Sequence, residues 1–236
     1  MPSSSRRSFL RHTGMSFAAG LAGGSLTLPA GAQPTPAARD ADVAERILKQ
    51  MGHPPEALRL KDGIARTKSR ALGPFYRESA PFRGKASPPF AEGQALVVSG
   101  RVWAYDTRRP LPGALLDVWH VDHEGRYSDG DGDFRNRVRL IASESGAYEF
   151  ESTHPVAYPA SPEFWRSPHI HFICTSPGYD RLVSEMFFEG DPRHDTDALF
   201  HPALCVPVAR ETIRGQPLER AVFDIILVPE SSARGG

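Results

Sequence analysis

Residues Ala95–Tyr105 read ALVVSGRVWAY, a run rich in the β-branched and aromatic side chains that favour strands. Five further short runs of this kind follow it, separated by turn residues. They are Ala114–Trp119, Val138–Ala142, Ala147–Phe150, His169–Cys174 and Ala221–Val228. Because no helical pattern separates the runs, they predict an all-β fold with an antiparallel β-sandwich core.

The composition is that of an ordinary globular domain. The chain has 236 residues, with 28 basic and 28 acidic side chains and 40% hydrophobic residues. A formal net charge of zero offers no basic surface, so we expect no nucleic acid as a partner. Two cysteines, Cys174 and Cys205, exclude a disulfide framework. They could pair in an oxidising compartment, although free cysteine is more often a small buried residue.

The N-terminal part predicts an exported protein. Arg6 and Arg7 form a twin-arginine pair ahead of an apolar stretch rich in glycine and alanine, which ends in small residues suited to a signal peptidase. We therefore expect a twin-arginine signal peptide over residues 1–32 and a periplasmic or otherwise exported mature protein. That protein would have no stable membrane span after cleavage.

Two segments are expected after the signal peptide, and an extended arm crosses the boundary between them. Residues 33–71 form a linker that contains one short helix at Ala41–Met51, where apolar residues recur with helical spacing. Residues 72–236 form the β-sandwich domain. Thr67–Glu92 is rich in Pro, Gly, Arg and Ser, which predicts an extended arm. The sequence leaves the oligomeric state open and allows a homo-oligomer.

One of the strand runs contains two histidines in the order His-Ile-His. Side chains alternate between the faces of a strand, so His169 and His171 share a face and can bind one metal ion together. Two upstream tyrosines, Tyr127 and Tyr158, indicate which metal. A phenolate is a hard, strongly donating oxygen that suits a trivalent ion such as Fe(III), whose charge would lower the tyrosine pKa from its usual value of about 10.

Several motifs follow one another in a consistent order between Leu72 and Pro192. They are Gly73–Tyr76, Ser99–Val102, Leu111–Trp119, Gly125–Tyr127, Gly146–Phe150, Tyr158–Pro159, Trp165–Phe172 and Phe187–Pro192. This ordered series resembles the family of intradiol ring-cleavage catechol dioxygenases. Within that family the series is most similar to the iron-binding β subunit of protocatechuate 3,4-dioxygenase.

The resemblance implies a non-haem Fe(III) enzyme that cleaves a catechol-type ring with O2 to a cis,cis-muconate-type dicarboxylate, without an organic cofactor. It implies four iron ligands, which are Tyr127, Tyr158, His169 and His171. Tyr158 would also act as the base that accepts a substrate proton. Arg166 would lie near the substrate ring and stabilise charge that develops there, a task suited to a planar guanidinium. The partners would be a catechol-type small molecule and O2.

Glu185 departs from the family pattern, because the relatives have a glutamine that helps to hold an anionic intermediate. We include Glu185 among the catalytic residues and expect it to pair with Arg166, to be protonated, or to point away. An ionised and unpaired carboxylate would repel a catecholate. The segment before Gly73 lacks the pattern that recognises the ring carboxylate in protocatechuate enzymes. The substrate therefore stays open among catechol, protocatechuate, hydroxyquinol and related compounds.

Two alternatives compete with this interpretation. A cupin-like Fe(II) or Zn(II) enzyme also has His-X-His on a strand, but it needs a nearby glutamate, and Phe172–Pro177 contains no carboxylate. A noncatalytic transthyretin-like or carboxypeptidase-regulatory-like β-sandwich would explain the strands and turns. It would not explain two tyrosines together with His-X-His. Colour separates these cases, because tyrosinate bound to Fe(III) is wine red and the alternatives are almost colourless.

Overall fold

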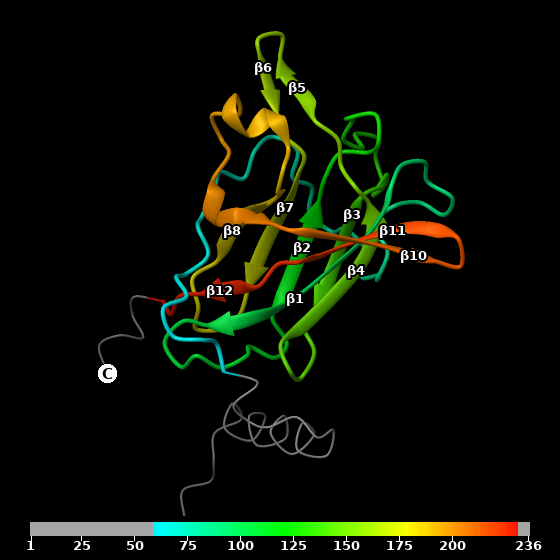
Figure 1. Ribbon diagram of the computed structural model, residues 1–236. Helices are drawn as coiled ribbons and strands as arrows, with labels where there is room; N and C mark the ends of the chain where they lie inside the picture. Colours follow the sequence, from blue (N-terminus) through cyan, green and yellow to red (C-terminus); the bar gives the residue numbers. More distant parts are fainter. Residues whose placement is uncertain (1–58, 231–236) are drawn as a thin grey trace, which may run out of the picture. The chain divides into compact units, whose positions relative to one another are not determined.

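The computed structural model describes residues 59–230 (Figure 1). Strands dominate these residues, so the predicted all-β fold is confirmed. Two short 3₁₀ helices occur in this part of the chain, η2 (Pro192–Asp195) and η3 (Pro202–Leu204). No helix among the described residues is long and apolar enough to cross a membrane. The predicted signal peptide at 1–32 and the predicted helix at Ala41–Met51 lie outside the described residues.

The first five-stranded sheet is built around β1 (Ala95–Ala104). The other strands are β10 (Val208–Ile213), β11 (Gln216–Val222), β12 (Ile225–Leu227) and β4 (Ala147–Thr153). β4 runs antiparallel to β1, whereas β11 and β12 both run parallel to it. The sheet is therefore mixed, although antiparallel pairing was expected throughout.

The prediction of a single strand at Ala221–Val228 is wrong, because the strand is interrupted at Phe223 and Asp224, between β11 and β12. At the break the Phe223 side chain is buried in the core, and its N–H donates to the carbonyl of Ser99 at 2.8 Å. The Asp224 carboxylate accepts from the N–H of Arg101 at 2.8 Å. The Phe223 carbonyl lies where a Cβ on Gly100 would be, so only glycine fits opposite the break.

The second five-stranded sheet carries the residues of interest. Its order is β3 (Arg137–Ile141), β2 (Leu115–Trp119), β7 (His169–Thr175), β8 (Leu182–Phe188) and β9 (Cys205–Val206). A separate hairpin of β5 (Tyr158–Ser161) and β6 (Phe164–Arg166) precedes β7 and projects beyond the sheets in Figure 1. The strands β5, β6, β8 and β9 had not been expected from the sequence, and neither had β10 of the first sheet.

The two large sheets enclose the main core. Side chains of β1 and β4, such as Val98 and Phe150, pack in one cluster with Val118 of β2 and Phe172 of β7. Cys174 belongs to this cluster, and both cysteines are free thiols. The buried environment of Cys174 is the usual one for a free cysteine.

The arm predicted at Thr67–Glu92 contains no regular strand or helix, only isolated bridges such as Phe82 to Arg139. It covers the other face of the second sheet, where Leu72 and Tyr76 pack on a small cluster around Trp119. The second sheet is therefore buried on both sides. One side faces the apolar core, and the other faces the arm.

Candidate metal centre

Strand β7 places His169 and His171 as its alternation predicts. Both imidazoles point to the arm side of the sheet and are almost completely buried, with 1% and 3% of their surface exposed. Their Nε2 atoms lie 3.1 Å apart. Trp119, the cross-strand neighbour of His171 on β2, stacks flat on the His171 ring at 4.8 Å. The stacking fixes the direction in which this imidazole faces.

The hydrogen-bond partners of the two imidazoles leave both Nε2 atoms as acceptors. Nδ1 of His169 donates to the carbonyl of Ser167 at 2.7 Å, so its proton is on Nδ1. Nδ1 of His171 lies 3.5 Å from the carboxylate of Glu185, which favours a proton there as well. The Nε2 lone pairs of both imidazoles are then available to bind one positive centre between them.

The two predicted tyrosines complete the cluster. The hydroxyl of Tyr127 lies 3.0 Å from Nε2 of His171 and 3.4 Å from the hydroxyl of Tyr158. Tyr127 lies in the loop after β2, where Phe75 of the arm stacks on its ring at 4.2 Å, and Tyr158 begins β5. Ligand atoms about 2.1 Å from one metal and at right angles to each other are about 3 Å apart. The four donors therefore fit a single metal ion.

Without a metal ion, burial favours the neutral forms of both imidazoles and both phenols. It lowers the pKa of His169 to about 3 and lowers the pKa of His171 well below its usual range, and the positive charge of Arg166 adds to both effects. Burial also raises the pKa of Tyr127 and of Tyr158. A cation in the cluster would reverse the effect on the tyrosines, because it stabilises the phenolates.

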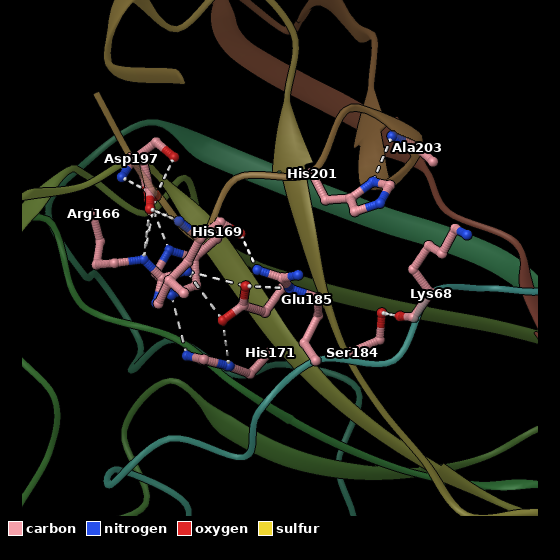
Figure 2. Close-up of polar contacts among 12 residues, drawn as sticks. Lys68, Arg166, His169, His171, Ser184, Glu185, Asp197, His201 and Ala203 are labelled. Carbon is pink, nitrogen blue, oxygen red and sulfur yellow. Dashed lines mark hydrogen bonds and ion pairs between the residues drawn. The ribbon is translucent and has the colours of Figure 1, made fainter. Parts of the chain in front are cut away.

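Arg166 ends β6 and lies between two carboxylates, as Figure 2 shows. Its Nε donates to both oxygens of Asp197 at 3.2 Å, and its Nη2 donates to Glu185 at 3.1 and 3.0 Å. Burial alone would lower the pKa of Arg166, but the two carboxylates outweigh it, so the net shift is upward. Of the three arrangements expected for Glu185, the structure contains the pair with Arg166.

Glu185 contacts a second cation and the back of the histidine ring. Nε of Arg70, from the arm, lies 3.7 Å from its carboxylate, and His171 is approached at Nδ1, not at Nε2. Glu185, His169 and His171 could by themselves form a metal-binding group. The geometry favours the tyrosines as the further ligands, because they face Nε2 while Glu185 is engaged by two guanidinium groups. Burial raises the pKa of Glu185, and Arg166 and Arg70 oppose this rise.

Comparison with known proteins identifies the family to which the chain belongs. Residues 73–227 match the family described as dioxygenase, which is more than half of the chain. The chain belongs to the intradiol ring-cleavage dioxygenases. A chlorocatechol 1,2-dioxygenase from Rhodococcus opacus is 34% identical over 187 residues, which are 68% of this chain and 72% of the relative.

Two further proteins support the assignment. The protocatechuate 3,4-dioxygenase β chain from Burkholderia cepacia is 32% identical over 140 residues, 55% of this chain and 58% of that relative. The dioxygenase domain of a dioxygenase and carbohydrate-binding protein fusion from Streptomyces sp. SirexAA-E has a TM-score of 0.63 at 31% identity. It covers 70% of this chain and 100% of that domain. These matches decide for a dioxygenase over the cupin-like and noncatalytic alternatives.

Asp197 contacts Arg166 beside the cluster and had not been expected from the sequence. Its carboxylate accepts from the N–H of Ser167 at 2.9 Å, from the Ser167 hydroxyl at 2.7 Å and from Arg166. Burial would raise the pKa of Asp197, but these donors and the N–H of Leu199 outweigh burial and lower it. Asp197 lies in a polar run after η2, and nothing in that run distinguishes it from a surface acid.

The other histidines of the described residues lie outside the cluster. His120 is buried and contacts the Ser152 hydroxyl at 2.7 Å, and burial lowers its pKa to about 4. His154 pairs with Glu219, and His194 stacks on Phe200 at 3.9 Å. Each of these three histidines has a structural partner outside the cluster.

Proposed function

We propose that this dioxygenase holds one Fe(III) through Tyr127, Tyr158, His169 and His171 and cleaves a catechol-type ring between its two hydroxyl-bearing carbons. The observation that carries the proposal is the convergence of two imidazole nitrogens and two phenol oxygens at separations of 3.0 to 3.4 Å. Neutral imidazoles and phenolates together suit a trivalent ion. The bound ion would supply chelation of both catechol oxygens and activation of the ring toward O2.

Tyr158 is the residue we propose to accept a substrate proton. Its hydroxyl lies at the edge of the cluster, 3.4 Å from that of Tyr127, and burial raises its pKa. A phenolate with a raised pKa is a strong base once it is not stabilised by a cation. Tyr158 can therefore hold a proton at Oη while the other three donors keep their places.

We propose that Arg166 stabilises negative charge that develops near the substrate ring. The groups around Arg166 also indicate which substrates can bind. Both of its sides are occupied, by Asp197 on one and Glu185 on the other. Arg70 is also engaged, with Glu185 and with the carbonyl of Leu199. Each guanidinium already pairs with a carboxylate of the protein, and Glu185 would repel a carboxylate on the substrate. We therefore propose a catechol without a ring carboxylate, such as catechol, a chlorocatechol or hydroxyquinol.

Iron-loaded protein tests both parts of the proposal. We expect one iron per chain, a visible band from tyrosinate-to-Fe(III) charge transfer, and O2 uptake with catechol or hydroxyquinol that exceeds uptake with protocatechuate. Tyr127→Phe should lose most of the band, whereas Tyr105→Phe, at an exposed tyrosine outside the cluster, should not. A colourless iron-loaded protein would refute the ligand set. Preference for protocatechuate would refute only the substrate class.

We also propose that the enzyme is exported through the twin-arginine pathway, from Arg6 and Arg7 and the apolar stretch behind them. This route carries folded proteins, so a metal could be bound before export. Changing both arginines to lysine should leave the protein in the cytoplasm, and cell fractionation measures this. Normal export of the double variant would contradict the assignment.

A further inference from the structure

Arg137 is a buried cation without an ionic partner. It begins β3 and is 2% exposed, yet none of the ion pairs among the described residues includes it. Its donors go to neutral acceptors instead. Nε donates to the hydroxyl of Ser128 at 2.9 Å, Nη2 to the carbonyl of Ser128 at 3.1 Å, and Nη1 to the carbonyl of Phe75 at 2.7 Å. A buried charge is costly unless an opposite charge lies near it.

Both residues that Arg137 binds are in contact with Tyr127. Ser128 follows Tyr127 in the chain, and Phe75 stacks on the Tyr127 ring at 4.2 Å with an angle of 13° between the planes. The guanidinium carbon of Arg137 itself lies 5.9 Å from the centre of the Tyr127 ring. One side chain therefore fixes the backbone beside Tyr127, the ring that covers it and a positive charge that faces it.

The sheet fixes Arg137 relative to the histidine ligand as well. Arg137 is the cross-strand neighbour of Trp119, and Trp119 is the cross-strand neighbour of His171. Trp119 stacks on the His171 ring with an angle of 5° between the planes. A row of three neighbouring side chains on one face of the sheet thus joins Arg137 to the metal cluster.

We propose that Arg137 is a positioning residue that holds Tyr127 in place as a metal ligand and places a fixed positive charge beside its ring. The inference rests on the proposed function, since it needs Tyr127 to be an iron ligand. The phenolate would be the anion that the buried guanidinium otherwise lacks. Arg137 does not reach the cluster of donor atoms, so it acts through Tyr127 and not on the substrate.

A charge beside a phenolate has a spectroscopic consequence that packing alone does not. The positive charge lowers the energy of the phenolate electrons, so the charge-transfer band lies at higher energy than it would without Arg137. Arg137→Met keeps much of the side-chain length but removes the charge. We expect a red shift on the order of 10 nm, estimated from the interaction of two unit charges near 6 Å, and faster loss of iron to a chelator.

Arg139→Met is the matched control. Arg139 lies two residues along β3 on the same face, and its guanidinium covers Phe82 at 4.4 Å and donates to the carbonyl of Ala80. We expect an unshifted band and wild-type iron retention from it. Arg137→Lys keeps a charge but cannot bind Ser128 and Phe75 together, so it should lose iron several-fold faster with a smaller band shift than Arg137→Met.

The outcomes separate the inference from the proposed function. Absence of a tyrosinate band in the iron-loaded wild type refutes the proposed function. If folded, iron-loaded Arg137→Met has its band at the wild-type wavelength, the role of Arg137 is refuted. If Arg137→Met does not fold, the lysine variant decides, because wild-type iron retention in Arg137→Lys would refute the positioning role.

Discussion

The two faces of the second sheet are formed by the same strands but have different surroundings. Val118 and Phe172 face the core, where the neighbours are apolar and come from the first sheet. Trp119 and His171, one position later or earlier, face the arm, where the neighbours are tyrosines and charged groups. The core face stabilises the fold by burial of apolar surface, whereas the arm face holds the charged groups and the candidate metal ligands. Stability and chemistry are therefore separable at the level of adjacent residues.

The largest expected effect is on the arm face. His171→Ala removes a donor that no nearby side chain replaces, so iron content should fall to background and O2 uptake by at least about a thousandfold. The iron-free variant should stay folded with a lower midpoint of thermal unfolding, because the lost imidazole leaves a cavity beside Trp119. Metal analysis and calorimetry measure the two quantities. Normal iron content in this variant would place the metal elsewhere.

The neighbouring residue should respond in the opposite way. Phe172→Ala leaves a cavity in the core and should lower the free energy of unfolding by about 3–5 kcal/mol. Protein that stays folded should keep its iron and its visible band, because the ring of Phe172 points away from the cluster. Urea denaturation and metal analysis check this. Loss of iron from the folded variant would show that the two faces are coupled.

Asp197 tests the pairing of buried charge. Asp197→Asn removes the negative charge but keeps the shape, so Arg166 loses one of its two carboxylates and the turn at Ser167 loosens. We expect turnover to fall by about 10–100-fold. Asp197→Ala should be worse, since it also removes the acceptor for Ser167. An unchanged turnover number in the asparagine variant would mean that Glu185 alone holds Arg166.

The pH dependence of this support follows from the lowered pKa of Asp197. A carboxyl whose folded pKa is depressed contributes stability above its unfolded value of about 3.8, and this contribution is lost as the pH falls through the folded value. The contribution should be absent in Asp197→Asn. Unfolding curves of both proteins well below pH 3.8 and near pH 6 provide the comparison, and only the wild type should lose this contribution at the lower pH.

Glu185→Gln should have a smaller and more selective effect. A glutamine can still accept from Arg166 but brings no charge, so Arg166 and Arg70 become less engaged. We expect the step with O2 to be slower by a few fold. The apparent Michaelis constant for catechol should be unchanged, and that for protocatechuate should be lower. Steady-state kinetics with the catechol and O2 varied separately measure these values. A lower constant for catechol itself would show that the carboxylate opposes all catecholates.

The last prediction concerns the stability of the iron-free protein and its buried histidines. Burial lowers the pKa of His120 to about 4 and of His169 to about 3, so the folded protein binds fewer protons than the unfolded chain between these values and about 6.5. Stability is therefore greatest above pH 6.5 and is lost as the pH falls. We expect a loss of about 1–2 kcal/mol per buried histidine from pH 7 to pH 5. A flat urea midpoint over this range would contradict the pKa shifts.

The sequence predicted those parts of the fold that depend on local pattern. Alternation placed His169 and His171 on one face, and β1, β2, β3, β4 and β7 fall close to their predicted runs. It did not predict β8, because both faces of Leu182–Phe188 are buried and the polar alternation that marks a half-exposed strand is missing. The strand break opposite Gly100 also depends on a segment more than a hundred residues away, which no local pattern records.

The candidate site divides in the same way. The types and order of its donors, two tyrosines and a His-X-His pair, were determined by the sequence alone. Which charges surround them was decided by the tertiary structure. Asp197 reaches Arg166 from a loop 31 residues away, Arg70 reaches Glu185 from the arm, and Arg137 reaches Tyr127 through the pairing of β3 with β2. Electrostatic pairing acts over a few ångströms in space and leaves no period in the sequence, so only the folded chain defines these partners.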